Sequence, residues 1–174
     1  MKLNITTDFT KFPRAVSVLP AGEAGAAAPY DRAVLPHDER HLRRRVIETA
    51  SGGKVLVDLP EPAVLNDGDR LVLEDGRQIG IVAAPEEVYE VRARDAVHLA
   101  ELAWHIGNRR LEIDIAQDRI LILRDPAAKA MLEGLGVAVS EVSHPFSPVP
   151  GAHSGHDHDH HHHHAHDHHH HDHD

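Results

Sequence analysis

The sequence predicts an α+β protein with a small N-terminal β-sandwich or barrel domain, a ferredoxin-like βαββαβ domain and a disordered His-rich tail. Short alternating apolar runs between glycine-containing turns fill the first half of the chain, as in small β domains. Two segments with the apolar periodicity of a helix then alternate with predicted strands, in the order of a split βαβ fold. The last 22 residues hold 14 histidines and too few apolar side chains to offset the entropy of ordering. We therefore expect domains at 1–84 and 85–145, and a proline-containing linker with the tail at 146–174.

The first domain is predicted from strands of period two that alternate with turns. The run KVLVDL follows a Gly52-Gly53 turn and places every second apolar side chain on one face. Turns at Asn66–Asp69 and Asp75-Gly76 then bracket the strand RLVLE, and QIGIVAA follows the second turn. Residues 1–20 show no clear pattern, and PAGEAGAAAP at 20–29 is typical of a loop or an insertion.

The second domain is predicted from two capped helices among four strands. Asp95 is an N-cap for AVHLAELAWHI, which ends at Gly107-Asn108. Asp125-Pro126 is an N-cap followed by proline at the first helical position, and this helix ends before Gly136. The predicted strands are VYEVRA, LEIDIA, RILILR and VAVSEVSH. The resulting order is β-α-β-β-α-β.

Composition excludes several classes of function. The 174 residues include no cysteine, which removes disulfides, thiolate metal sites and cysteine nucleophiles. The net charge is −10 and aromatic residues make up 3%, which argues against nucleic-acid binding. No apolar run is long enough for a signal core or a membrane span. Phosphate-binding glycine motifs and a nucleophile elbow are also missing from the sequence. We expect a cytoplasmic protein without enzymatic activity, with no catalytic or cofactor-binding residues and no nucleic-acid or membrane partner.

The tail is the main candidate for metal binding. A purification tag would be one unbroken run, whereas here the longest run is five histidines, and five aspartates interrupt the rest. Neutral imidazole has a free lone pair and suits nickel, copper, zinc and cobalt. At roughly two to four imidazoles per ion, the tail would hold about three to seven ions, unless it binds metal only in the test tube. The candidate ligands are His153, His156, His158, His160, His161, His162, His163, His164, His166, His168, His169, His170, His171 and His173.

The first predicted helix carries three further potential ligands. His98, Glu101 and His105 are spaced i, i+3, i+7, which places them on one stripe. The two histidines are separated by two turns, about 10.5 Å, so one chain cannot bind a single ion with both. One interpretation is that they only flank the apolar stripe. His105 is retained as a candidate metal ligand.

A charged segment in the first domain carries two more histidines. His37, Glu39 and His41 precede the basic run Arg43–Arg45. The positive charge of that run opposes the binding of a cation. We therefore expect this segment to be a solvated face or a turn.

Several stretches of the chain resemble one known family in the same order. They are HDER with the following RRR, GDRLVLEDG, EVYEVRA, AWHIGNR, RDPAAKAMLEGLG, and HPFSPVPGAH before the His-rich tail. These stretches resemble the UreE family of urease accessory proteins, which are nickel metallochaperones. The resemblance implies a homodimer formed through the ferredoxin-like domain. It also implies delivery of Ni²⁺ to apo-urease together with other accessory proteins, including a GTPase. Zn²⁺, Cu²⁺ and Co²⁺ would also bind in vitro. The alternative is a passive nickel or zinc store without a delivery partner.

Three positions depart from the family pattern. The family motif GNRH is GNRR here, so Arg110, which cannot ligate a metal, stands where the family histidine lies at the dimer interface. The family pair Asp-His at the start of the second helix is Asp125-Pro126. The family GAYH lacks its tyrosine and leaves Ala152 before His153. Because these departures remove the ordered ligands that the resemblance implies, we expect metal binding to depend on the tail.

Overall fold

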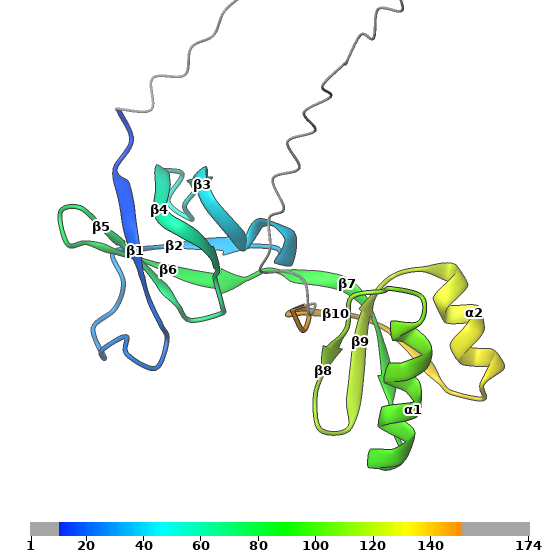
Figure 1. Ribbon diagram of the computed structural model, residues 1–174. Coiled ribbons are helices and arrows are strands. Elements are labelled where there is room, and N and C mark those ends of the chain that lie inside the picture. The colour runs from blue at the N-terminus through cyan, green and yellow to red at the C-terminus, as the bar shows by residue number, and fades with distance from the viewer. Residues whose placement is uncertain (1–10, 151–174) are drawn as a thin grey trace, which may run out of the picture.

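The computed structural model describes residues 11–150, which form two lobes connected by a continuous strand region (Figure 1). The N-terminal lobe is built from six strands and a short 3-10 helix. These elements are β1 Arg14–Leu19, β2 Asp31–Leu35, η2 His37–Glu39, β3 His41–Glu48, β4 Lys54–Val64, β5 Arg70–Leu73 and β6 Gln78–Ala83. The expected loop at 20–29 contains no helix or strand.

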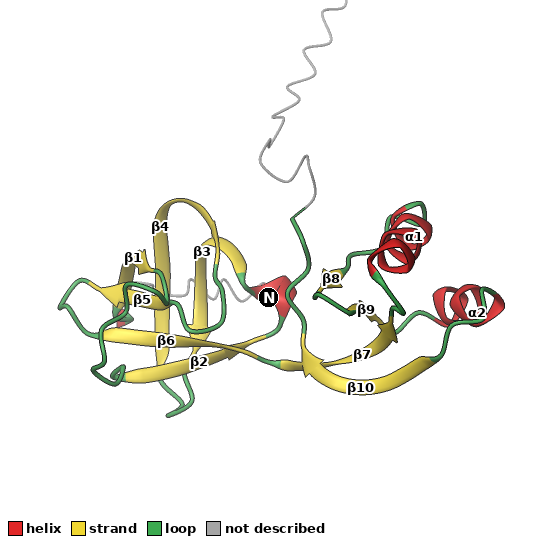
Figure 2. Cartoon of the chain, turned by 90° about the horizontal axis from the view of Figure 1, so that it is seen from below, coloured by secondary structure: helices red, strands yellow, loops and turns green. Residues whose placement is uncertain are grey.

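The N-terminal strands form one curled sheet in the order β2-β6-β5-β1-β4-β3 (Figure 2). The pairs β1·β4 and β2·β6 are parallel, and the remaining pairs are antiparallel. Alternate side chains point into the curl, where Val57, Leu71 and Ile79 are almost fully buried. Burial of this inner face stabilises the half-barrel, at about 25 cal/mol per Å² of apolar area. The predicted β class of the first half is confirmed.

Strand β1 was not expected from the sequence. It lies in the middle of the sheet, between β5 and β4, although residues 1–20 show no clear apolar alternation. The reason is that Ala15 is its only buried residue. Arg14 instead forms an ion pair at 2.7 Å with Asp58, which lies on the neighbouring strand β4. It forms a second ion pair at 3.1 Å with Glu74, which follows β5 directly. Such a strand is held mainly by its backbone ladder, which leaves little hydrophobic signal in the sequence.

The C-terminal lobe is the predicted ferredoxin-like unit. Its strands form an antiparallel sheet in the order β10-β7-β9-β8. Both helices cover the same face of this sheet (Figure 2). The elements are β7 Pro85–Arg92, α1 Ala96–Gly107, β8 Asp114–Ile115, β9 Arg119–Leu123, α2 Pro126–Gly134 and β10 Val139–Pro145. The predicted strand LEIDIA is thus only two residues long in β8.

The core of this lobe lies between the sheet and the helices. Leu102 and Ile106 of α1 and Leu132 of α2 pack against the inner face of β9, with Ile120 and Ile122 fully buried. These positions follow the helical period and the strand period of the sequence. The opposite face of β9 holds Leu121, which packs with Val88 and Phe146. Strand β9 is therefore apolar on both faces, as its sequence RILILR indicates.

Both helices begin at the predicted aspartate caps. The Asp95 carboxylate accepts the backbone N–H of His98 at 2.9 Å, and the Asp125 carboxylate accepts that of Ala128 at 2.7 Å. The backbone N–H bond from His98 is the main cause that lowers the pKa of Asp95 below its ordinary value. Pro126 occupies the first turn of α2, where its missing N–H costs no helical bond.

The two lobes meet at a short junction. A single residue separates β6 from β7, and the segment after β10 returns to the N-terminal lobe with Phe146 fully buried. The expected linker thus begins with an anchored side chain. Neither helix of the described part is long and apolar enough to cross a membrane. The division into domains at residue 84 stays a prediction.

Candidate metal centre

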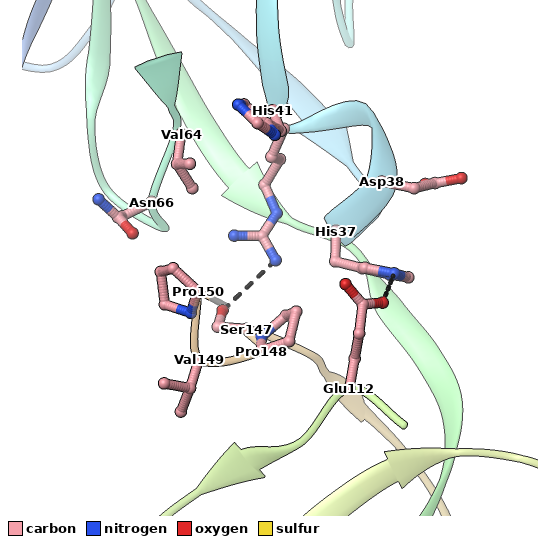
Figure 3. Close-up of a pocket in the computed structure, with 11 residues that line it drawn as sticks. His37, Asp38, His41, Val64, Asn66, Glu112, Ser147, Pro148, Val149 and Pro150 are labelled. Carbon is pink, nitrogen blue, oxygen red and sulfur yellow. Dashed lines mark hydrogen bonds and ion pairs between the residues drawn. The ribbon is translucent and has the colours of Figure 1, made fainter. Parts of the chain in front are cut away.

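A cavity of about 630 Å³ lies where the two lobes meet (Figure 3). The N-terminal lobe contributes His37, Arg40 and His41 to its lining. Glu112, from the loop before β8, and the segment Ser147–Pro150 complete it from the C-terminal side. The described part of the chain ends at the edge of this cavity, directly before the His-rich sequence.

His37 is held between two carboxylates. Its backbone N–H donates to Glu86 Oε1 at 2.8 Å, and its Nδ1 lies 2.7 Å from Glu86 Oε2. On the other side of the ring, Nε2 lies 3.4 Å from Glu112 Oε2. The imidazole also packs edge to face on Phe146, with ring centroids 5.1 Å apart. These contacts fix both the position and the plane of the ring.

Arg40 joins the lobes through neutral acceptors. The residue is 3% exposed, and its guanidinium donates to the carbonyls of Leu65 and Phe146 and to the Ser147 hydroxyl. Its Nε is the one buried side-chain polar atom of the described residues that has no partner. A buried guanidinium bonded to carbonyls holds the segment after β10 against the N-terminal lobe.

The helix histidines are not brought together with other ligands. His98 Nδ1 accepts the backbone N–H of Arg94 at 3.1 Å, so one ring nitrogen is occupied near the start of α1. His105 is half-buried near the end of α1, and its ring contacts that of Trp104 edge to face at 4.9 Å. Glu101 between them is exposed. Among residues 11–150, no group of three or more histidine, aspartate or glutamate side chains is arranged to hold a metal ion.

Two of the positions that depart from the family pattern, Arg110 and Pro126, lie at the ends of helices in the ferredoxin-like lobe. Arg110 follows α1 in the left-handed region, with φ of 58°. Pro126 lies in the first turn of α2, and Asp125 is used as its cap. Neither position offers a metal-binding nitrogen. The fourteen tail histidines all lie outside the described residues, so their ligand role stays a prediction.

Three residues at the joint were missed by sequence reasoning. None of Glu86, Glu112 and Arg40 was expected from the sequence to contact His37 or Phe146. They contact His37 or Phe146 across separations of 49, 75 and 106 residues respectively. No local spacing encodes such long-range contacts. The segment was expected to be a solvated face or a turn. It does form the short 3-10 helix η2, and His41 is exposed, but the side chain of His37 is only 14% exposed because it points toward the second lobe.

The fold and the sequence together define a two-lobed α+β protein with a cavity at the joint and a histidine-rich sequence after residue 152. Comparison with known protein families gives two matches that together cover most of the chain. The model for the N-terminal domain of UreE urease accessory proteins matches residues 13–84, and that for their C-terminal domain matches residues 86–173. The chain belongs to the UreE urease accessory protein family.

Curated relatives agree with this assignment over most of their length. The chain is 73% identical over 158 residues to urease accessory protein UreE of Mesorhizobium japonicum, covering 90% of this chain and 81% of that protein. It is 58% identical over 142 residues to UreE of Brucella anthropi, covering 82% and 84%. It is 54% identical over 143 residues to UreE of Rhizobium rhizogenes, covering 82% and 85%.

Proposed function

We propose that this protein is a non-enzymatic nickel metallochaperone that donates Ni²⁺ for assembly of the urease metal centre. Its partners are apo-urease and the other accessory proteins, including the GTPase, in the cytoplasm. The observation that carries the proposal is the combination of family membership with 14 histidines in the last 22 residues. Imidazole is the ligand of this chain that best suits nickel, and it also accepts Zn²⁺, Cu²⁺ and Co²⁺.

A transfer assay tests delivery against passive storage. Apo-urease with its GTPase and remaining accessory proteins is mixed with the nickel-loaded chain, and urease activity is followed over time. The control supplies the same total nickel from a small chelator set to the same free-ion concentration. A metallochaperone activates urease faster than the chelator does, and the advantage requires the GTPase. Equal rates from the two sources would support the storage function instead.

The homodimer is proposed to form through the ferredoxin-like lobe. On α1, Val97 is 70% exposed and Trp104 is 64% exposed. They are seven residues apart and therefore share one side of the helix, opposite the buried Leu102 and Ile106. Covering this apolar surface in a second copy of the chain removes it from water, which favours association.

The dimer is tested by sedimentation equilibrium of a charge-introducing variant. Trp104→Glu is expected to give monomers, because an unpaired carboxylate would be buried in the interface. Val34→Glu is the matched control, because Val34 is 52% exposed on β2 of the other lobe. If both variants remain dimeric, the interface lies elsewhere.

A further inference from the structure

The outer face of the N-terminal lobe places two arginines on either side of a glycine. Gly80 on β6 pairs with Arg32 on the edge strand β2 and with Arg70 on β5, so the three residues form one row across the sheet (Figure 2). Alternate residues of a strand point to opposite faces, and the neighbouring Ala33 and Leu71 are buried in the core. Both arginines therefore point outward, where they line a hollow of about 300 Å³.

Gly80 keeps the space between the two arginines open. The Cγ atom of Arg32 lies 3.7 Å, and the Cγ atom of Pro29 lies 3.0 Å, from the position that a Cβ atom of Gly80 would occupy. A larger residue at this position would therefore crowd Pro29 and the stem of Arg32. The stem of Arg32 leans across the row toward Gly80, and so toward the strand that carries Arg70.

The charges in the hollow are unbalanced. Arg70 is half-buried, and its guanidinium donates to the Gln78 side chain at 2.8 Å and to the Gly25 carbonyl at 2.9 Å, which are neutral acceptors. Neither Arg32 nor Arg70 forms an ion pair within residues 11–150. Asp67 also lines the hollow, but its carboxylate accepts a backbone N–H of β6. One positive charge remains in excess, in a chain whose net charge is −10.

Apolar side chains adjoin the two arginines. Val34 pairs in register with Val82, so this pair forms the next outward row beside Arg32 and Gly80. Val34 is 52% exposed, and Val82 lines the hollow. A small free anion would balance the charge but leave the valines in water. A protein segment that carries a carboxylate beside apolar side chains would cover both.

We propose that Arg32, Arg70, Val34 and Val82 form a docking surface for an acidic segment of a partner protein. A carboxylate of that segment lies between the two guanidinium groups, which suit the two oxygens of a carboxylate and repel each other without an anion. Charge complementarity of this kind steers association and fixes the register of the bound segment. The surface lies on the other lobe from α1, so a dimer formed through α1 leaves it accessible.

The test is fluorescence anisotropy of a dye-labelled peptide of alternating aspartate and leucine residues, titrated with the full chain. A chelator and a pH of about 8 keep imidazole groups metal-free and neutral. We expect the wild type to bind the peptide, and to bind it more weakly as the salt concentration rises. Arg32→Glu changes an exposed side chain and replaces an attraction with a repulsion, so it is expected to weaken binding about tenfold.

Arg43→Glu is the matched control, because Arg43 is also exposed but lies on β3, outside the lining of the hollow. It changes the net charge equally and is expected to change the affinity by less than about twofold. Equal losses in the two variants, or no binding by the wild type, would overturn the docking surface. No metal is present in this experiment, so its failure leaves the proposed nickel delivery unaffected.

A second variant distinguishes a protein segment from a small anion. Val34→Ser keeps both arginines but removes apolar surface, and it is expected to weaken binding of the peptide as well. If Val34→Ser binds the peptide as the wild type does and free citrate displaces the peptide, the hollow is a site for small anions only. That result would overturn the assignment to a protein partner.

Discussion

Arg110 is the only residue other than glycine with positive φ in the described part of the chain, at 58°. It follows the end of α1, and its backbone N–H donates to the carbonyl of Gly107 at 2.8 Å, which closes the turn. For a residue with a Cβ, the left-handed region costs about 1–2 kcal/mol. The residue that stands where the resemblance implies an interface histidine therefore also occupies a strained position.

Replacing Arg110 with glycine is expected to stabilise the protein. Arg110→Gly relieves the Cβ strain but increases the entropy of the unfolded chain, so the net gain in the free energy of unfolding is up to about 1 kcal/mol. The neighbouring Arg109→Gly has no such strain to relieve and is expected to lower the free energy of unfolding. Urea unfolding at neutral pH measures both variants. A loss of stability in Arg110→Gly would contradict the assignment of strain.

A second prediction concerns Asp31, at the start of β2. The Ser51 hydroxyl, with smaller contributions from Thr49 and the backbone of Arg32, lowers the pKa of this carboxyl to about 2. Because the folded-state pKa lies below the unfolded value of 3.8, the ionised group stabilises the fold above pH 3.8, and this contribution is lost as the pH falls toward 2. Ser51→Ala is expected to raise the pKa of Asp31 and to lower stability at neutral pH.

The measurement for Ser51→Ala is carboxyl NMR titration combined with urea unfolding at two pH values. At about pH 7 the variant should be less stable than the wild type, and near pH 2 the two should converge. A stability difference that does not change with pH would assign the effect of Ser51 to the turn itself. It would not then reflect the ionised carboxylate of Asp31.

At the scale of elements, the cap of α2 carries a third prediction. This helix has only nine residues, and its N-terminal N–H groups depend on the carboxylate of Asp125. Asp125→Ala is expected to lower the free energy of unfolding by about 1 kcal/mol. Glu133→Ala, near the other end of the helix, serves as control and is expected to change stability by less than about 0.5 kcal/mol. Thermal or urea unfolding distinguishes the two.

The elements that could be predicted from the sequence are those with a local signal. Both helices are predicted by an aspartate cap and an apolar stripe, and β9 is predicted by its continuous apolar run. Strand β1 has neither, because polar partners such as Asp58 hold its outer face. Strand β8 was predicted too long, because only two residues of LEIDIA pair with β9. The apolar periodicity of a segment does not indicate how many of its residues pair with a neighbouring strand.

Less of the candidate site than of the fold could be predicted from the sequence. The tail histidines are visible by composition alone, whereas His37 was assigned to a solvated face or a turn, and the three arginines that follow it argued against cation binding. In the structure those arginines, Arg43–Arg45, are exposed on β3, and Arg45 pairs with Glu39 at 2.7 Å. His37 turns the other way, toward Glu86 and Glu112. The direction of one side chain relative to a second lobe is a tertiary property, which no spacing in the segment encodes.

At the scale of the whole molecule, nickel binding is expected to weaken steeply between about pH 7 and pH 5.5. Protons compete with nickel for imidazole nitrogens, whose ordinary pKa is about 6.5. The reason to expect this for the full chain is that 14 of its 19 histidines lie in the tail, while cysteine is absent. Equilibrium dialysis at several pH values measures the effect. An affinity that stays constant across this interval would assign the sites to carboxylates.

The final prediction separates the body from the tail. A chain cut after Ala152 should still unfold cooperatively in the presence of chelator, because both hydrophobic cores lie within residues 11–150. Thermal unfolding followed by circular dichroism measures this. A shortened chain that requires nickel to fold would contradict it, and would make the tail part of the folding unit.

The same shortened chain should lose nearly all tight nickel binding. Its histidines are His37, His41, His98, His105 and His144. None of these is brought together with two other potential ligands among residues 11–150, and Arg110 and Pro126 stand where the resemblance implies ordered ligands. In a homodimer with the family geometry, two Arg110 guanidinium groups would approach each other. Unless they pair with carboxylates such as Glu112 or Asp114, they repel each other and a dication.

Restoring the family residue tests this explanation directly. Arg110→His in the shortened chain is expected to create a site that binds one nickel ion per two chains, because two imidazoles then replace two cations at the proposed interface. Isothermal titration with nickel, together with the dimer mass from sedimentation, gives the stoichiometry. If the shortened wild-type chain already binds one nickel ion per dimer tightly, His105 or another residue of the body supplies the interface ligand, and the role assigned to Arg110 is wrong.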